Sequence, residues 1–152
     1  MRALQIFQLV WAALVLSSCG GPPESFPEEV KVDSMIASVS SGVLREGCRS
    51  QVYRLAEETR NELRNGTRLL GNGSSEEHRG STQWSETPFP AANSGYALPG
   101  FTSCFAESRE FSYRDLEKAM TSPGNYYKQT PNREGFTLLV PERGIAIHIY
   151  VG

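Results

Sequence analysis

The sequence predicts an α+β fold in which one main helix packs on an antiparallel sheet. Three patterns predict it: apolar residues at helical spacing over 50–64, a second capped helix at 112–120, and two β-rich runs near the carboxyl end. With 39% apolar and 21% charged residues among 152, the composition is that of one ordinary soluble domain. The formal net charge of −2 excludes a protein that binds nucleic acid through overall positive charge, so any RNA contact needs a local cluster of Arg.

Residues 1–18 have the features of a secretory signal peptide. Arg2 precedes an apolar run over 4–16, and the small residues Ser17 and Ser18 follow it. The run is too short to span a bilayer comfortably, and no later stretch has the length and apolar content of a transmembrane helix. We therefore expect a secreted protein from which residues 1–18 are removed.

The end of the signal peptide is compatible with two locations of the mature protein. Residues 16–19, Leu-Ser-Ser-Cys, resemble the lipobox of bacterial lipoproteins, in which the thiol of Cys19 carries a lipid. The protein would then be held at the bacterial outer membrane, and a membrane is expected as a partner only in that case. Two N-x-[ST] sequons, at Asn65 and Asn72, favour a eukaryotic secreted glycoprotein instead.

Cysteine and histidine usage predicts one disulfide and no metal site. Once Cys19 is removed or lipidated, Cys48 and Cys104 form an even pair in an oxidising compartment. A disulfide between them is the prediction, and two buried free thiols are the alternative. With His78 and His148 as the only histidines, and no Cys/His cluster at ligand spacing, we expect no metal and no cofactor. We also expect a monomer.

The first half of the chain predicts a tether and then the main helix. Residues 19–47 are predicted as a tether and N-terminal extension, because 20–29 are rich in Pro, Gly and Glu. The valines of 30–47 fit a short strand or a helix equally. From Ser50, a potential cap, apolar residues fall at helical spacing until Asn65-Gly66 ends the helix. Its apolar face comprises Val52, Leu55, Ala56, Thr59 and Leu63.

The second half predicts a long loop, a short helix and a hairpin. Residues 71–95 are rich in Gly, Ser, Asn and Pro, and they hold Trp84 and Phe89. Ser112-x-x-Asp115 begins a helix that 122–124 end. The β-rich runs 136–140 and 145–151 are joined by Pro-Glu-Arg-Gly, a hairpin signal. In the last run, one face comprises Ile145, Ile147, Ile149 and Val151, and the other Ala146, His148 and Tyr150.

Several short motifs follow one another in the order found in the small guanyl-specific fungal ribonucleases. The segment that begins Cys48-x-Ser50-x-x-Tyr53 resembles the opening of that family, and Glu110-Phe111 resembles its Glu-aromatic strand. Pro131-Asn132-Arg133 resembles its P-G-x-D-R, and the segment from Gly144 to His148 resembles its G-x-x-x-H. Residues 48–152 thus resemble a microbial ribonuclease-like domain.

The resemblance implies a catalytic trio. Cleavage of RNA through its own 2′-hydroxyl needs a base for that proton, an acid for the leaving 5′-oxygen, and a cation beside the phosphorane. By resemblance, Glu110 is the base, His148 the acid and Arg133 the phosphate clamp.

Departures from the family pattern point to loss of catalysis. Thr87 and Phe89 stand where the family has a Tyr and a His, and the helix at 113–120 has no counterpart. A ribonuclease scaffold with a signal peptide, one disulfide and a degraded site resembles the RNase-like secreted effectors of powdery-mildew fungi. That group implies a virulence role by binding host RNA or a host protein, without catalysis. The alternatives are a lipoprotein held through Cys19 as an envelope interaction module, and an active secreted endoribonuclease.

The predicted binding residues are aromatic. Trp84 and Phe89 in the long loop, and Tyr150 beside His148, would suit base stacking on RNA or a protein hot spot next to Arg133. Packing of Trp84 and Phe89 against the core is the structural alternative.

Overall fold

The described part of the chain forms an antiparallel sheet with two short helices, an α+β fold as predicted. The computed structural model describes residues 30–43, 46–66, 83–90, 103–130 and 134–151. Six strands lie in the order β1-β2-β6-β5-β4-β3, and all neighbours are antiparallel. In chain order, the elements are β1 (Val32–Val43), β2 (Glu46–Leu55), α1 (Glu57–Arg64), β3 (Ser85–Glu86), α4 (Tyr113–Thr121), β4 (Tyr126–Gln129), β5 (Gly135–Val140) and β6 (Ile145–Val151).

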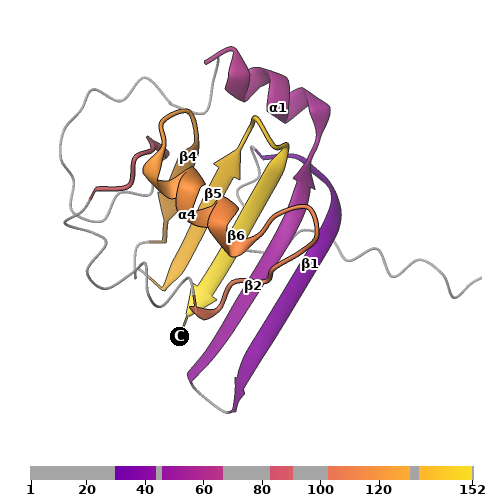
Figure 1. The fold of residues 1–152 in the computed structure, drawn as a ribbon, viewed down its shortest axis with the longest axis vertical. Helices are drawn as coiled ribbons and strands as arrows, with labels where there is room; N and C mark the ends of the chain where they lie inside the picture. Colours follow the sequence, from indigo (N-terminus) through magenta and orange to yellow (C-terminus); the bar gives the residue numbers. More distant parts are fainter. Residues whose placement is uncertain (1–29, 44–45, 67–82, 91–102, 131–133, 152) are drawn as a thin grey trace, which may run out of the picture.

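The sheet carries an apolar core on each face. On one, which we call the α4 face, α4 crosses the central strands (Figure 1), and the buried residues include Val52, Phe111, Leu116, Met120, Leu138, Ile147 and Ile149. On the other, the α1 face, Leu63 of α1 packs with Val30, Tyr53, Leu55, Trp84, Leu139 and Ala146. Successive residues of a strand point to opposite faces, so Ala146 and Ile147 belong to different cores.

The main helix predicted from about Val52 to Arg64 is wrong over its first half. β2 continues to Leu55, and α1 begins only at Glu57. Val52 and Leu55 are three residues apart, which fits a helix, but here they lie on opposite faces of a strand. Because β2 pairs with β1 on one side and β6 on the other, its backbone groups are satisfied in the sheet. Ser50, predicted as a cap, is a buried strand residue.

The second predicted helix is confirmed as α4. The Ser112 hydroxyl accepts a hydrogen bond from the Asp115 N–H at 3.3 Å, and the Asp115 carboxylate accepts one from the Ser112 N–H at 2.8 Å. This reciprocal capping box fixes the start of the helix. It is α4, not the predicted main helix, that covers the face with Ile145, Ile147 and Ile149.

The sheet begins before the domain start predicted at Cys48. β1 pairs with β2 from Val32 to Val43, so most of the predicted extension 19–47 that the structure describes is a strand of the sheet. Val32, Val39 and Val43 therefore belong to a strand, a choice that the sequence pattern left open, whereas Val30 precedes it. Cys48 lies inside β2.

The predicted C-terminal hairpin and the predicted disulfide are both present. β5 and β6 pair directly, and Gly144 in their turn has φ of 63°, a conformation that favours glycine. Cys48 is bonded to Cys104, 56 residues later. Close by, the Ala106 N–H donates to the Ser50 hydroxyl at 3.1 Å. These two links hold the segment that leads to α4 against β2.

Candidate functional site

Glu110, the predicted base, lies on the α4 face. Its carboxylate accepts two hydrogen bonds from Nη2 of Arg54, at 2.8 and 2.9 Å, and both side chains are about half exposed. Arg54 is two residues after Val52 on β2, and its register partner is Ile145, so it projects from the α4 face. Glu110 is therefore engaged in a surface ion pair on that face.

His148, the predicted acid, projects from the opposite face of the sheet. Its neighbours in β6, Ile147 and Ile149, belong to the core under α4. The His148 side chain is only 2% exposed, and its Nδ1 lies 2.9 Å from Oγ1 of Thr137, the register partner on β5. Burial lowers the pKa of His148 below its ordinary 6.5, so the ring is neutral at pH 7.

The structure does not bring the predicted catalytic residues together. The sheet itself lies between Glu110 and His148, and Arg133 lies outside the described residues. Alternation along β6 predicts the face of His148 correctly. The face on which Glu110 lies depends instead on the path of residues 104–111 beside β2. The disulfide of Cys104 and the hydrogen bond of Ala106 fix that path.

Burial of His148 predicts acid sensitivity. The unfolded chain binds a proton to this histidine near pH 6.5, whereas the folded chain binds it only at lower pH. The free energy of unfolding should therefore fall as pH drops through 6.5, until the folded pKa is reached. We expect urea unfolding at pH 7.5, 6.5 and 5.5 to show this loss in the natural chain and a smaller one in His148→Gln. Parallel pH profiles for the two proteins would refute the assignment.

Two of the predicted binding aromatics are core residues. Trp84 and Phe89 are each 8% exposed, so the expectation that they are surface aromatics is wrong. Phe89 packs on Tyr127 and Phe136, with ring centroids at 4.7 and 5.6 Å. Trp84 lies on the α1 face, and Nζ of Lys128 lies 5.7 Å from the centroid of its ring. Short sheet pairing of β3 with β4 draws this part of the long loop into the core.

The other predicted site residues fall at the surface or outside the described ranges. Tyr150 is 40% exposed, and its hydroxyl donates to the Glu134 carboxylate at 2.9 Å. Asn65 is the exposed C-cap residue of α1, so this sequon asparagine is accessible. Asn72 and Cys19 lie outside the described residues.

A cavity of about 610 Å³ that sequence reasoning missed lies where α1, α4 and the β5–β6 turn meet. Its floor is apolar and buried, and consists of Leu63, Phe111, Ala119 and Val140. Its rim is charged, and consists of Arg64, Asp115, Lys118, Glu142 and Arg143. The volume falls in the range of roughly 300–1,000 Å³ typical of ligand pockets.

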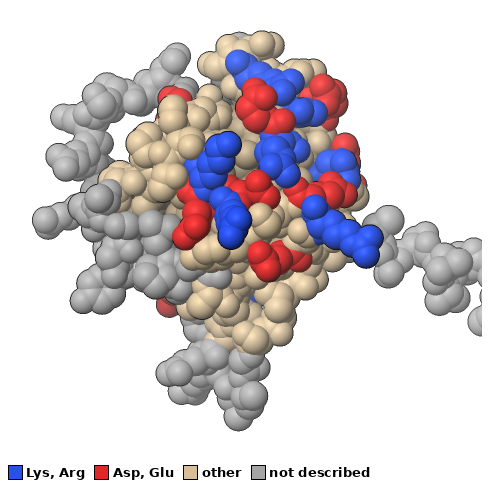
Figure 2. Space-filling model, in the orientation of Figure 1, with Lys and Arg blue, Asp and Glu red and all other residues tan. Residues whose placement is uncertain are grey.

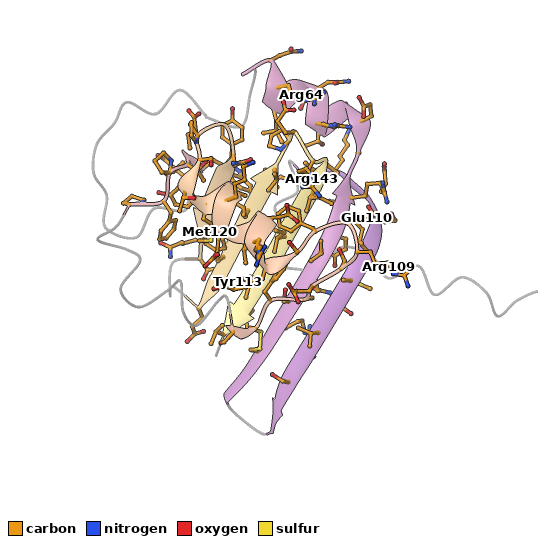
Figure 3. The ribbon with its side chains drawn as sticks, in the orientation of Figure 1. Arg64, Arg109, Glu110, Tyr113, Met120 and Arg143 are labelled. Carbon is orange, nitrogen blue, oxygen red and sulfur yellow. A yellow bond between two sulfur atoms is a disulfide. The ribbon has the colours of Figure 1, made fainter. Side chains whose placement is uncertain are left out.

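Arginines hold the turn against both helices. Nε of Arg60 donates to the Pro141 carbonyl at 2.9 Å, and Nη2 of Arg60 donates to the Glu142 carbonyl at 3.0 Å. From the turn, Arg143 reaches back to Asp115 of α4 at 2.9 Å and lies 5.7 Å from the Phe111 ring centroid. Figure 3 shows Arg64 on α1 at one end of the sheet, with Arg143 below it. The cavity walls are thus tied to one another.

The capping carboxylate of α4 is also a charge of this rim. Hydrogen bonds from the backbone and hydroxyl of Ser112, and then the nearby Arg143, hold the pKa of Asp115 below its ordinary 3.8. Asp115 is therefore ionised at neutral pH. No sequence pattern indicated the cavity, because its lining residues range from Leu63 to Arg143 and meet only in the folded chain.

Within the described ranges, no group of three or more His, Cys, Asp or Glu side chains could hold a metal ion, and neither helix is long and apolar enough to cross a membrane. No family model, curated protein or solved structure matches the chain.

Proposed function

We propose that this chain is a secreted, RNase-like effector that acts by binding a host protein, without catalysis. The observation that carries the proposal is the separation of Glu110 from His148 by the sheet. General acid and base catalysis of one phosphoryl transfer needs both groups within hydrogen-bond reach of the same substrate. A side chain on each face of a sheet cannot meet that requirement.

The environment of each residue supports the same conclusion. Neutral His148 is 2% exposed and faces Thr137, so it is poorly placed to donate a proton to a leaving oxygen. The carboxylate of Glu110 accepts two hydrogen bonds from Arg54, so both of its oxygens are already engaged within the protein. Phe89, at the position of the family's first histidine, packs in the core. Each residue has a structural role where it lies.

Charge pairing favours a protein partner over RNA. Five cations of the described chain form ion pairs with carboxylates: Lys31, Arg54, Arg60, Arg64 and Arg143. Figure 2 shows positive and negative side chains interleaved over the face with α1 and α4. Binding of a phosphate backbone depends on clustered cations that replace its counterions, and neighbouring carboxylates oppose it. An interleaved surface suits the polar rim of a protein interface better.

Ribonuclease assays test the absence of catalysis. We expect no cleavage of a GpN dinucleotide or of total RNA above the buffer rate, because the predicted base Glu110 and the predicted acid His148 lie on opposite faces of the sheet. His148→Gln, purified in parallel, should leave that background unchanged, which separates the chain from a contaminating nuclease. Robust cleavage that His148→Gln abolishes would overturn the proposal and establish the endoribonuclease alternative.

RNA binding tests the choice of partner. A single-stranded oligonucleotide titrated at 50 and 200 mM salt should show weak binding at both. Tight binding that falls steeply over this range, by counterion release, would assign the chain to RNA instead.

A further inference from the structure

The rim of the cavity between α1, α4 and the β5–β6 turn carries an unbalanced positive charge. Arg64 pairs with Glu142 at 3.1 Å, and Arg143 pairs with Asp115 at 2.9 Å. Lys118 lines the same rim and makes no ion pair or side-chain hydrogen bond with any described residue. Among the described residues of the rim, three cations and two carboxylates thus leave one positive charge that an occupant can meet.

The floor of the cavity is apolar and can take an apolar group. Leu63, Phe111, Ala119 and Val140 line it although their own side chains are almost fully buried, so they form a preformed apolar floor. An occupant that displaces water from this floor gains by burying apolar surface of its own. A purely polar anion would meet the charge of the rim and leave the floor unused.

A second exposed cation lies one turn before Lys118 on α4, a helix whose two basic residues are balanced in number by Asp115 and Glu117. Arg114 lies four residues before Lys118, so the two exposed side chains are neighbours on one side of the helix. Arg114, like Lys118, makes no ion pair with a described residue. Two free cations along a helix fit an extended occupant with more than one anionic group better than a small monoanion.

We infer that this cavity binds an acidic peptide segment of a partner protein, with an apolar side chain on the floor and carboxylates beside Lys118 and Arg114. The inference rests on the proposed function, in which the chain binds a protein. Phosphates of RNA fit less well, because Asp115 and Glu142 stand on the same rim. Carboxylates of a peptide can instead be spaced to meet the two free cations and avoid both acids.

Selection from a random peptide library displayed on phage tests the inference on the full exported chain with its disulfide intact. We expect enriched peptides with Asp or Glu on either side of a large apolar residue. The most enriched peptide, synthesised with a fluorophore and titrated by anisotropy, should bind Lys118→Glu at least about tenfold more weakly, because attraction becomes repulsion. Lys118→Ala should have a smaller effect in the same direction.

Arg109→Glu is the matched control. Arg109 is also an exposed cation without an ion pair to a described residue, but it does not line the cavity, and Figure 3 shows it pointing away from Arg143. Its reversal should leave the affinity within about twofold. Equal losses in Arg109→Glu and Lys118→Glu would mean general electrostatic attraction, and would overturn the site.

Other outcomes separate this inference from the proposed function. Enrichment of acidic peptides that bind Lys118→Glu normally would overturn the cavity, while protein binding stands. Enrichment of basic or uncharged peptides would overturn the acidic partner. Failure to enrich any peptide, with tight RNA binding, would overturn both proposals. The selection is repeated on a variant in which Glu24, Glu28 and Glu29 are replaced by Lys. If acidic peptides are enriched only on this variant, the chain's own acidic segment occupies the cavity, and an external partner would be overturned.

Discussion

Replacement of Ile147 by aspartate is expected to unfold the protein. Ile147 has 0% exposed surface in the middle of β6, and its register partners Val52 and Leu138 are equally buried. A carboxylate at this position would lose its hydration and gain no partner, which places the substitution among those that cost more than about 4 kcal/mol. Native domains are stable by only about 5–15 kcal/mol. Circular dichroism on heating should therefore show a strongly lowered or absent cooperative transition.

Leu63→Asp tests the second core in the same way. Leu63 is 4% exposed and packs on the α1 face with Tyr53 and Trp84, so we expect a large loss of stability there too. Met35→Asp is the matched control, because Met35 is 49% exposed on the edge strand β1. Its melting temperature should stay within a few degrees of the natural one. Near-normal melting of both core variants would contradict the two-core arrangement.

The elements that could be predicted from the sequence are those that interactions between residues close in the chain determine. α4 was predictable because Ser112 and Asp115 cap each other within one turn. The C-terminal hairpin was predictable because its turn is short and Ile145, Ile147 and Ile149 alternate with smaller or polar residues. The stretch around Val52 was not, because spacings of three and four residues suit a helix. Its strand pairing depends on β6, which lies almost one hundred residues later.

The candidate site could be predicted less well than the fold. Period-two alternation placed His148 opposite the isoleucines, but nothing local indicated that Glu110 would lie across the sheet from it. Composition of the loop suggested that Trp84 was exposed, whereas pairing of β3 with β4 buries it. Lys118 and Arg143 form one rim only because α4 and the β5–β6 turn pack together. Tertiary contacts, rather than motifs, define this cavity.

Reduction of the disulfide between Cys48 and Cys104 is expected to destabilise the protein strongly. The bond closes a loop of 56 residues, and loop-closure entropy of that length corresponds to about 4 kcal/mol in the free energy of unfolding. We expect the urea midpoint of the oxidised chain to fall on addition of dithiothreitol. The measurement uses Cys19→Ser, so that a third thiol cannot exchange with the pair.

The double variant Cys48→Ser, Cys104→Ala distinguishes the covalent link from the packing of its two ends. Cys104 is 1% exposed in the core under α4, so its side chain contributes burial as well as a bond. If the link is the main effect, the double variant should match the reduced natural chain and should not respond to dithiothreitol. If packing at Cys104 adds to it, the double variant should be the less stable of the two. If the oxidised and reduced chains unfold at the same urea concentration, the expectation is wrong. The hydrogen bond from Ala106 to Ser50 and the burial of Phe111 would then hold the segment between Cys104 and α4 on β2 without the disulfide.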